Sequence, residues 1–100
     1  MERKQIENAI LWVYGENGIL SEDQMELFLI VESLPKRYFD IVIGRIVQGK
    51  KWSQMESEYF YSERRMRDIL KEAMEILERR FSDAISCGKI SPETVGRFFN

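Results

Sequence analysis

The stretch from Ser62 to Ser86 is 25 residues long, contains no glycine or proline, and repeats its apolar residues at helical spacing. These residues follow one another at intervals of four, three and four positions: Met66, Leu70, Ala73 and Leu77. Such intervals place side chains on one face of an α-helix. Ser62 suits the N-cap, and Gly88 ends the pattern. We therefore predict one long amphipathic helix, whose apolar face the rest of the chain must cover.

The remaining sequence also favours helices, because alternation of apolar and polar residues never persists while three- and four-residue spacing recurs. Glycine, proline and capping residues divide it into segments. We expect helices at about Glu2–Tyr14, at Ser21 to about Glu32, from Leu34-Pro35 to Gly49, from Ser53 to about Tyr59, and from Ser91-Pro92 to Phe98-Phe99. The predicted fold class is all-α, a compact domain of five or six helices.

Two capping boxes and one glycine set the predicted helix ends. Ser21 with Gln24, and Ser53 with Glu56, have the spacing in which two side chains satisfy free amide groups. Gly49 is placed for a left-handed C-cap. The helix before Gly49 is expected to turn five apolar residues inward: Phe39, Val42, Ile43, Ile46 and Val47.

We divide the chain into three parts. Residues 1–33 form an N-terminal helical support, residues 34–86 contain the long helix and its neighbours, and residues 87–100 form a short C-terminal helix. Trp52 is expected in the core. For Trp12 and for Phe98-Phe99, both packing onto the domain and a contact with a second copy remain open.

The composition excludes several kinds of protein. A 44% hydrophobic content with 12% aromatic residues supports a core without disulfides or metals. The lone Cys87 and the absence of histidine exclude the usual zinc sites and histidine-based catalysis. The acidic cluster Glu16, Glu22, Asp23 and Glu26 lacks the loop spacing of a calcium site. No catalytic constellation is visible, so we expect neither an enzyme nor a bound cofactor or metal.

Two further features concern the expected location of the protein. The apolar runs are too short to span a bilayer, and the N-terminus shows no signal-peptide pattern. A single cysteine also suits a reducing compartment. We therefore expect a cytoplasmic protein without a membrane partner.

The formal net charge of −2 hides an uneven distribution. Residues 1–35 contain two basic and seven acidic residues, residues 36–71 contain nine basic and five acidic, and residues 72–100 contain four basic and five acidic. The middle of the chain is thus a basic region between acidic flanks, which is typical of a nucleic-acid contact. Ordinary solvated helix faces are the alternative explanation.

The basic region contains a short helix, the aromatic stretch Tyr59-Phe60-Tyr61 and the start of the long helix. This order suits a helix-turn-helix, in which a bracing helix positions a second helix for the major groove. On a helical wheel Arg64, Asp68 and Lys71 point away from the apolar stripe. Arg65 and Arg67 lie at its sides. Tyr59 and Tyr61 are expected to be core residues of the turn, and Phe60 to be partly exposed.

From Leu34-Pro35 to about Arg80 the chain resembles region four of bacterial sigma factors, and most of all the small sigma-region-four-like regulators of phages and prophages. The resemblance rests on Leu34-Pro35 with Arg37, on Gly49 three residues before Trp52, on Met55 and Tyr59, on Tyr61-Ser62-Glu63-Arg64, and on the apolar stripe of the long helix. Two positions differ from the family pattern. Glu56 stands where a small residue is usual, and Phe60 where a turn glycine is usual, so we expect a different elbow.

The resemblance implies a phage or prophage transcription regulator that binds double-stranded DNA. Arg64, Arg65 and Asp68 would then read bases, and Lys50, Lys51, Arg67 and Lys71 would contact phosphates. Arg37 and Arg45 are expected to be surface residues. The alternative is a protein-interaction module that binds RNA polymerase or another host complex. A homodimer is a further possibility.

Overall fold

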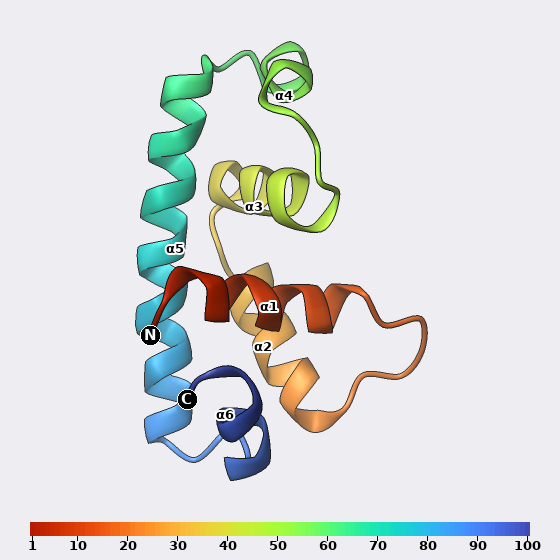
Figure 1. Cartoon of the computed structure of the whole chain (residues 1–100), viewed down its shortest axis with the longest axis vertical. Coiled ribbons are helices and arrows are strands. Elements are labelled where there is room, and N and C mark those ends of the chain that lie inside the picture. Colours follow the sequence, from red (N-terminus) through yellow and green to blue (C-terminus); the bar gives the residue numbers. More distant parts are fainter.

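The computed structural model describes all residues 1–100 as six α-helices with one π-helical turn and no strands (Figure 1). The elements are α1 (Arg3–Tyr14), α2 (Glu22–Glu32), α3 (Lys36–Val42), the π-turn η1 (Ile43–Val47), α4 (Trp52–Tyr59), α5 (Glu63–Ser86) and α6 (Pro92–Phe98). The predicted all-α class is confirmed. None of these helices combines the length and the apolarity that crossing a membrane requires.

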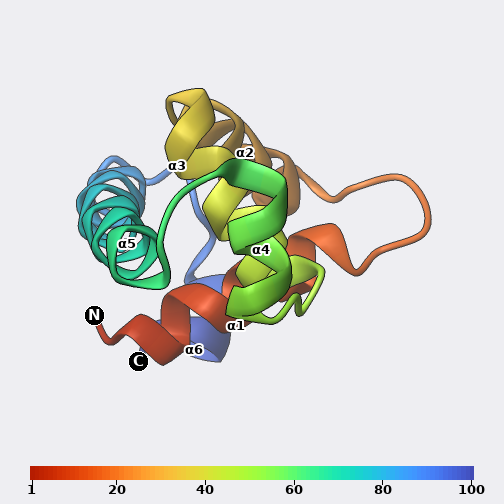
Figure 2. The ribbon, with the colours of Figure 1, turned by 90° about the horizontal axis from the view of Figure 1, so that it is seen from above.

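Helix α5 is the axis of the molecule. It runs along the longest dimension, which measures 40 Å, and α1, α2, α3 and α4 all pack against it (Figure 1). Helix α4 lies beside its N-terminal end, and α6 lies near its C-terminal end. Seen along this axis, α5 occupies one side of the molecule and α4 lies over the layer of α1 and α3 (Figure 2). The chain thus presents the α4–α5 end as one pole of an elongated domain.

The apolar face of α5 forms the centre of a single core of 20 buried residues. The four stripe residues predicted from the sequence are all buried, together with Ile69 and Phe81. Helices α1 and α2 contribute Ile6, Ile10, Leu27 and Val31 from the opposite side. The long helix is therefore stabilised by burial of its apolar face more than by its own propensity.

Side-chain caps fix several helix ends where the sequence predicts them. Ser21 and Gln24 form the predicted capping box of α2. Ser62 Oγ accepts from the backbone N–H of Arg65 at 3.1 Å and begins α5. Ser91 caps α6, and Gly49 adopts a φ of +63°, the left-handed conformation expected there. These ends are confirmed.

The predicted single helix up to Gly49 is wrong in its second half. Regular α-helix ends at Val42, and η1 continues with the wider bonding pattern in which Gln48 N–H donates to the Ile43 carbonyl at 2.9 Å. The wider turn rotates the residues within it, so Ile43, Ile46 and Val47 are only half-buried. Phe39, in the regular part of the helix, is also only half-buried. Ile41, which the prediction omits, is fully buried beside Val42.

The predicted capping box of Ser53 and Glu56 does not form. Helix α4 begins at Trp52, with Lys51 as an N-cap that makes no side-chain hydrogen bond. Because the helix includes Trp52, this residue lies on the same helical face as Met55, three positions later. Both are buried, as predicted for Trp52. Burial of the indole therefore outweighs the capping hydrogen bonds in setting the start of α4.

The C-terminal residues fold back onto the domain. The ring of Phe98 lies 4.9 Å from that of Trp12, and Phe99 meets the buried Phe81 edge-on at 5.9 Å. Asn100 also accepts a hydrogen bond from Gln5 at 3.0 Å. Packing within the chain, which the sequence left open for Trp12 and Phe98-Phe99, is observed.

A carboxylate attaches α6 to the start of α2. Asp23 accepts hydrogen bonds from the Ser91 backbone N–H at 3.1 Å, from the Ser91 hydroxyl and from the Thr94 hydroxyl. Desolvation raises the pKa of Asp23, but these hydrogen bonds together exceed it and lower the pKa below its ordinary value. The ionised carboxylate is thus the form that the fold stabilises.

Replacing Asp23 by alanine is expected to lower the free energy of unfolding at pH 7 by roughly 1.5–3 kcal/mol, because the ionised acceptor of three hydrogen bonds is lost. Since the folded-state pKa is depressed, the contribution is present above the unfolded pKa and disappears as the pH falls through the folded one. Urea unfolding at pH 7 and pH 3 measures this difference. Equal losses at both pH values would contradict it.

Candidate functional site

Helices α4 and α5 are joined by only three residues, Phe60 to Ser62, and remain separate helices (Figure 1). Trp52 and Met55 on the inner face of α4 are buried, as is Met66 on the first turns of α5. Gly44 in η1 is also buried, and a side chain there would approach Met55 to 3.1 Å. Packing on η1 and α5 therefore holds α4 beside the N-terminal end of the long helix.

The connection turns at Phe60, which adopts φ 61° and ψ 27°, the only positive φ outside glycine. The expectation that a phenylalanine here produces a different elbow is wrong in this respect, since it takes up the conformation usual for glycine. Its ring is 90% exposed, which agrees with the predicted exposure. Tyr59 is half-buried, but Tyr61 is exposed, so its prediction as a core residue is wrong.

Replacing Phe60 by glycine is expected to stabilise the fold by about 1 kcal/mol. A left-handed conformation costs an L-residue roughly 1–2 kcal/mol, and glycine's greater freedom in the unfolded chain offsets part of that gain. The exposed ring contributes little packing that could be lost. Denaturant midpoints of the parent and variant test this, with Phe60→Ala as the control that removes the ring without relieving the strain. A lower midpoint for Phe60→Gly would contradict it.

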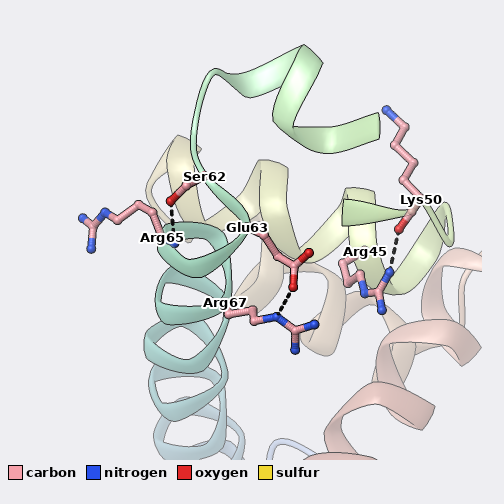
Figure 3. Close-up of polar contacts among 6 residues, drawn as sticks. All are labelled: Arg45, Lys50, Ser62, Glu63, Arg65 and Arg67. Atoms are coloured by element: carbon pink, nitrogen blue, oxygen red, sulfur yellow. Dashed lines mark hydrogen bonds and ion pairs between the residues drawn. The ribbon is translucent and has the colours of Figure 1, made fainter. Parts of the chain in front are cut away.

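Arg64 and Arg65 lie on the first turn of α5 with their side chains exposed. Neither takes part in any of the four ion pairs of the structure or in a side-chain hydrogen bond. The backbone of Arg65 is held by Ser62 while its guanidinium group extends away from the helices (Figure 3). Lys71 and Asp68, further along the same helix, are exposed and unpaired as well. These side chains are available to a ligand without breaking an internal contact.

Two predicted phosphate contacts are paired within the chain. Arg67 Nε lies 2.8 Å from a carboxylate oxygen of Glu63, one helical turn away (Figure 3). Lys50 Nζ lies 2.6 Å from Glu58, whose hydrogen bond raises the pKa of the lysine. Lys51 is exposed and has no such partner. Ion pairs at a protein surface are weak because solvent screens them, so an approaching phosphate can compete for both cations.

Trp52 is the structural centre of this end of the molecule. The guanidinium carbons of Arg45 and Arg67 lie 4.5 and 5.1 Å from the centre of its ring. Arg45 also donates to the Lys50 carbonyl at 2.8 Å (Figure 3). Arg45 is therefore half-buried and holds η1 against α4, which corrects its prediction as a surface residue. The indole N–H of Trp52 is buried without a partner.

Sequence reasoning missed Arg45 because its role depends on contacts between elements. The aromatic ring seven residues later and the arginine on α5 come together only once η1, α4 and α5 have packed. An arginine before a loop glycine and an aromatic residue is a weak signal for such stacking. Arg37 does lie on the surface, as predicted, over the ring of Tyr38 at 4.8 Å.

The largest cavity, about 420 Å³, opens beside the elbow. Its lining comes from the start of α3, the end of α4 and the connection: Lys36, Arg37, Asp40, Ile41, Glu58, Tyr59 and Tyr61. Its lining thus combines cationic, acidic and phenolic groups with the apolar Ile41. No group of three or more His, Cys, Asp or Glu side chains in the chain is arranged to hold a metal ion.

Comparison of this chain with protein families, with curated proteins and with solved structures found no match. The resemblance to sigma region four accordingly stays a prediction from the residues quoted above.

Proposed function

We propose that this chain is a non-enzymatic, sequence-specific DNA-binding transcription regulator in which α4 and α5 form a helix-turn-helix of the sigma-region-four kind. Helix α4 braces across the DNA backbone, and the first turns of α5 enter the major groove. The resemblance in sequence adds a phage or prophage setting to this proposal.

The observation that carries the proposal is the free state of Arg64 and Arg65. Both are exposed on the first turn of α5, and neither is neutralised by an acid of the chain. Helix α5 has 24 residues, buries its apolar face in the core and has unpaired arginines on its first turn. Such a helix suits insertion into a groove lined by phosphates. Ser62 anchors this first turn, so the two arginines are presented from a fixed backbone.

The predicted site residues divide into two roles. Arg64 and Arg65 pair with guanine edges, and Asp68 accepts from a cytosine amino group. Lys51 and Lys71 contact phosphates directly. Lys50 and Arg67 contact phosphates after release from Glu58 and Glu63. Glu58 and Glu63 therefore compete with the phosphates for these two cations, which weakens DNA binding.

Binding is tested with sequences selected from random duplex DNA. About four phosphate contacts predict an affinity that falls roughly a hundredfold between 50 and 200 mM salt. Electrophoretic mobility shifts across this salt range provide the measurement, and a selected duplex should compete better than a scrambled one. Absence of any complex at the lowest salt would refute the proposal.

A protein-interaction module that binds RNA polymerase or another regulator is the second candidate, and Phe60 favours it. Phe60 is a strained aromatic residue that is 90% exposed, and its chain neighbours Tyr59 and Tyr61 line the 420 Å³ cavity, so it has the features of an interface anchor. The two candidates separate by mutation. If a protein such as RNA polymerase is the ligand, Phe60→Ala abolishes binding to it and leaves duplex binding unchanged. If DNA is the ligand, Arg64→Ala weakens binding to the duplex and leaves binding to the polymerase unchanged.

A further inference from the structure

The outward face of α2 is apolar without a partner in the chain. Met25 and Leu29, one helical turn apart, are 44% and 54% exposed. On the opposite face of the same helix Leu27 and Val31 are fully buried. Helix α2 thus has apolar residues on two opposite faces, and only one of these faces is covered by the chain. Four of the seven exposed large hydrophobic side chains lie between residues 11 and 29: Leu11, Ile19, Met25 and Leu29.

Acidic residues border this apolar ridge. Glu22 lies three positions before Met25, Glu26 three before Leu29, and Glu32 three after it, which places all three carboxylates along the ridge. Between residues 15 and 33 the chain has five acidic residues and no lysine or arginine. Glu32 is held in position by the Tyr14 hydroxyl, which donates to it at 2.8 Å. Within α2 the ridge therefore has a purely acidic border. The neighbouring cations come from outside α2: Arg80, which donates to Ser33 Oγ at 2.7 Å, and Lys89 both line the hollow described next.

A hollow of about 200 Å³ adjoins the ridge, between α2 and the end of α5. Glu26 and Ile30 form its wall on the side of α2, and Ala84 lies across from them on α5. Its charged lining is balanced, since Glu26 and Asp83 face Arg80 and Lys89. An apolar side chain of a ligand packed on Leu29 can enter this hollow, so the surface offers both a ridge and a depression.

We propose that the face formed by Met25, Leu29 and their glutamates binds a cationic amphipathic helix of another protein. Helix-in-groove recognition uses apolar anchors at one-turn spacing, which Met25, Leu29 and the hollow complement. Lysine or arginine beside those anchors pairs with Glu22, Glu26 and Glu32. A second copy packed symmetrically on this face would set the same glutamates against each other, a like-charge contact that disfavours self-association.

The probe is a synthetic helix of about four turns built from leucine and lysine in an amphipathic pattern, compared with a leucine–glutamate peptide of the same pattern. Isothermal titration calorimetry with the full chain should show binding of the lysine peptide only. Leu29→Ala and Met25→Ala should each weaken it at least about tenfold, because each removes a buried apolar contact. Glu26→Gln should weaken it and reduce its salt dependence.

Tyr61→Ala and Glu56→Gln are the matched controls, since they remove an exposed aromatic and an exposed acidic residue at the α4–α5 end of the molecule (Figure 1). Both should bind the lysine peptide like the parent. All these positions are at least partly exposed, and circular dichroism confirms the fold of each variant. Failure of the lysine peptide to bind, equal binding of the glutamate peptide, or unchanged binding by Leu29→Ala overturns the proposal. So does a dimer in sedimentation that Leu29→Ala converts to monomers.

Discussion

Replacing Arg64 and Arg65 together by alanine is expected to weaken binding to a selected duplex by at least about thirtyfold. A bidentate arginine–guanine contact contributes roughly 1–3 kcal/mol, and about 1.4 kcal/mol corresponds to a factor of ten. The free energy of unfolding should change by no more than about 0.5 kcal/mol, because both side chains are exposed and neither makes an ion pair or a side-chain hydrogen bond. Fluorescence anisotropy at fixed salt gives the affinities, and urea unfolding gives the stability.

Arg79 provides the matched control for this double variant. It is an exposed arginine on the same helix, without an ion pair, but it lies toward the opposite end of α5. Arg79→Ala should bind the duplex like the parent. If it weakens binding as much as the double variant, the chain binds DNA only through general electrostatic attraction. If the folded double variant binds as tightly as the parent, α5 does not read the groove.

Replacing Phe81 by alanine is expected to lower the free energy of unfolding by about 3–5 kcal/mol, the usual effect of removing a fully buried phenylalanine. Phe81 has no exposed surface and joins the end of α5 to Phe99. Because a domain of this size has only about 5–15 kcal/mol of stability, the variant should be close to unfolding in dilute urea. Thermal and urea melts followed by circular dichroism measure the loss.

Phe60→Ala makes the same chemical change at a ring that is 90% exposed. Its stability should stay within about 0.5 kcal/mol of the parent. A similar loss in both variants would mean that Phe60 packs in solution. A small loss for Phe81→Ala would mean that the junction between α5 and the C-terminal residues is loose.

The features predicted from the sequence are those set by local pattern. The apolar stripe of α5, from Met66 to Leu77, extends over about three turns, and a regular helix must bury it. Ser21, Ser62 and Ser91 cap their helices through hydrogen bonds to residues three positions away. Gly49 needs only its own backbone conformation. Each of these outcomes depends on residues within a few positions, which a sequence displays directly.

The features that could not be predicted depend on contacts between distant segments. The hydrogen bonds of Asp23 join it to Ser91, 68 residues away. The start of α4 at Trp52 and the stacking of Arg45 on its ring follow from how η1, α4 and α5 pack. The π-turn has no periodic signature in so short a segment. Because the π-turn has more residues per turn than an α-helix, Ile43, Ile46 and Val47 are half-buried there. A regular helical wheel would place these apolar residues inward.

For the candidate site, the sequence located the exposed cations near α4 and on α5 and allowed pairing with neighbouring acids, but did not decide which cations pair. Arg67 and Lys50 have nearby acids on the same surface, and such pairs are too weak for a pattern to decide which cation stays free. Phe60 shows a different limit. Its left-handed backbone is unfavourable locally, and only the short path between α4 and α5 imposes it.

The length of α5 has a practical consequence. Its 24 residues span about 36 Å, with Arg64 near one end and the exposed, solitary Cys87 immediately after the other. A fluorophore coupled to that thiol would sit on the rim of the α2–α5 hollow and would not touch the arginines. Energy transfer between this fluorophore and a second one on a duplex would then report DNA binding without any change at the cationic end of α5.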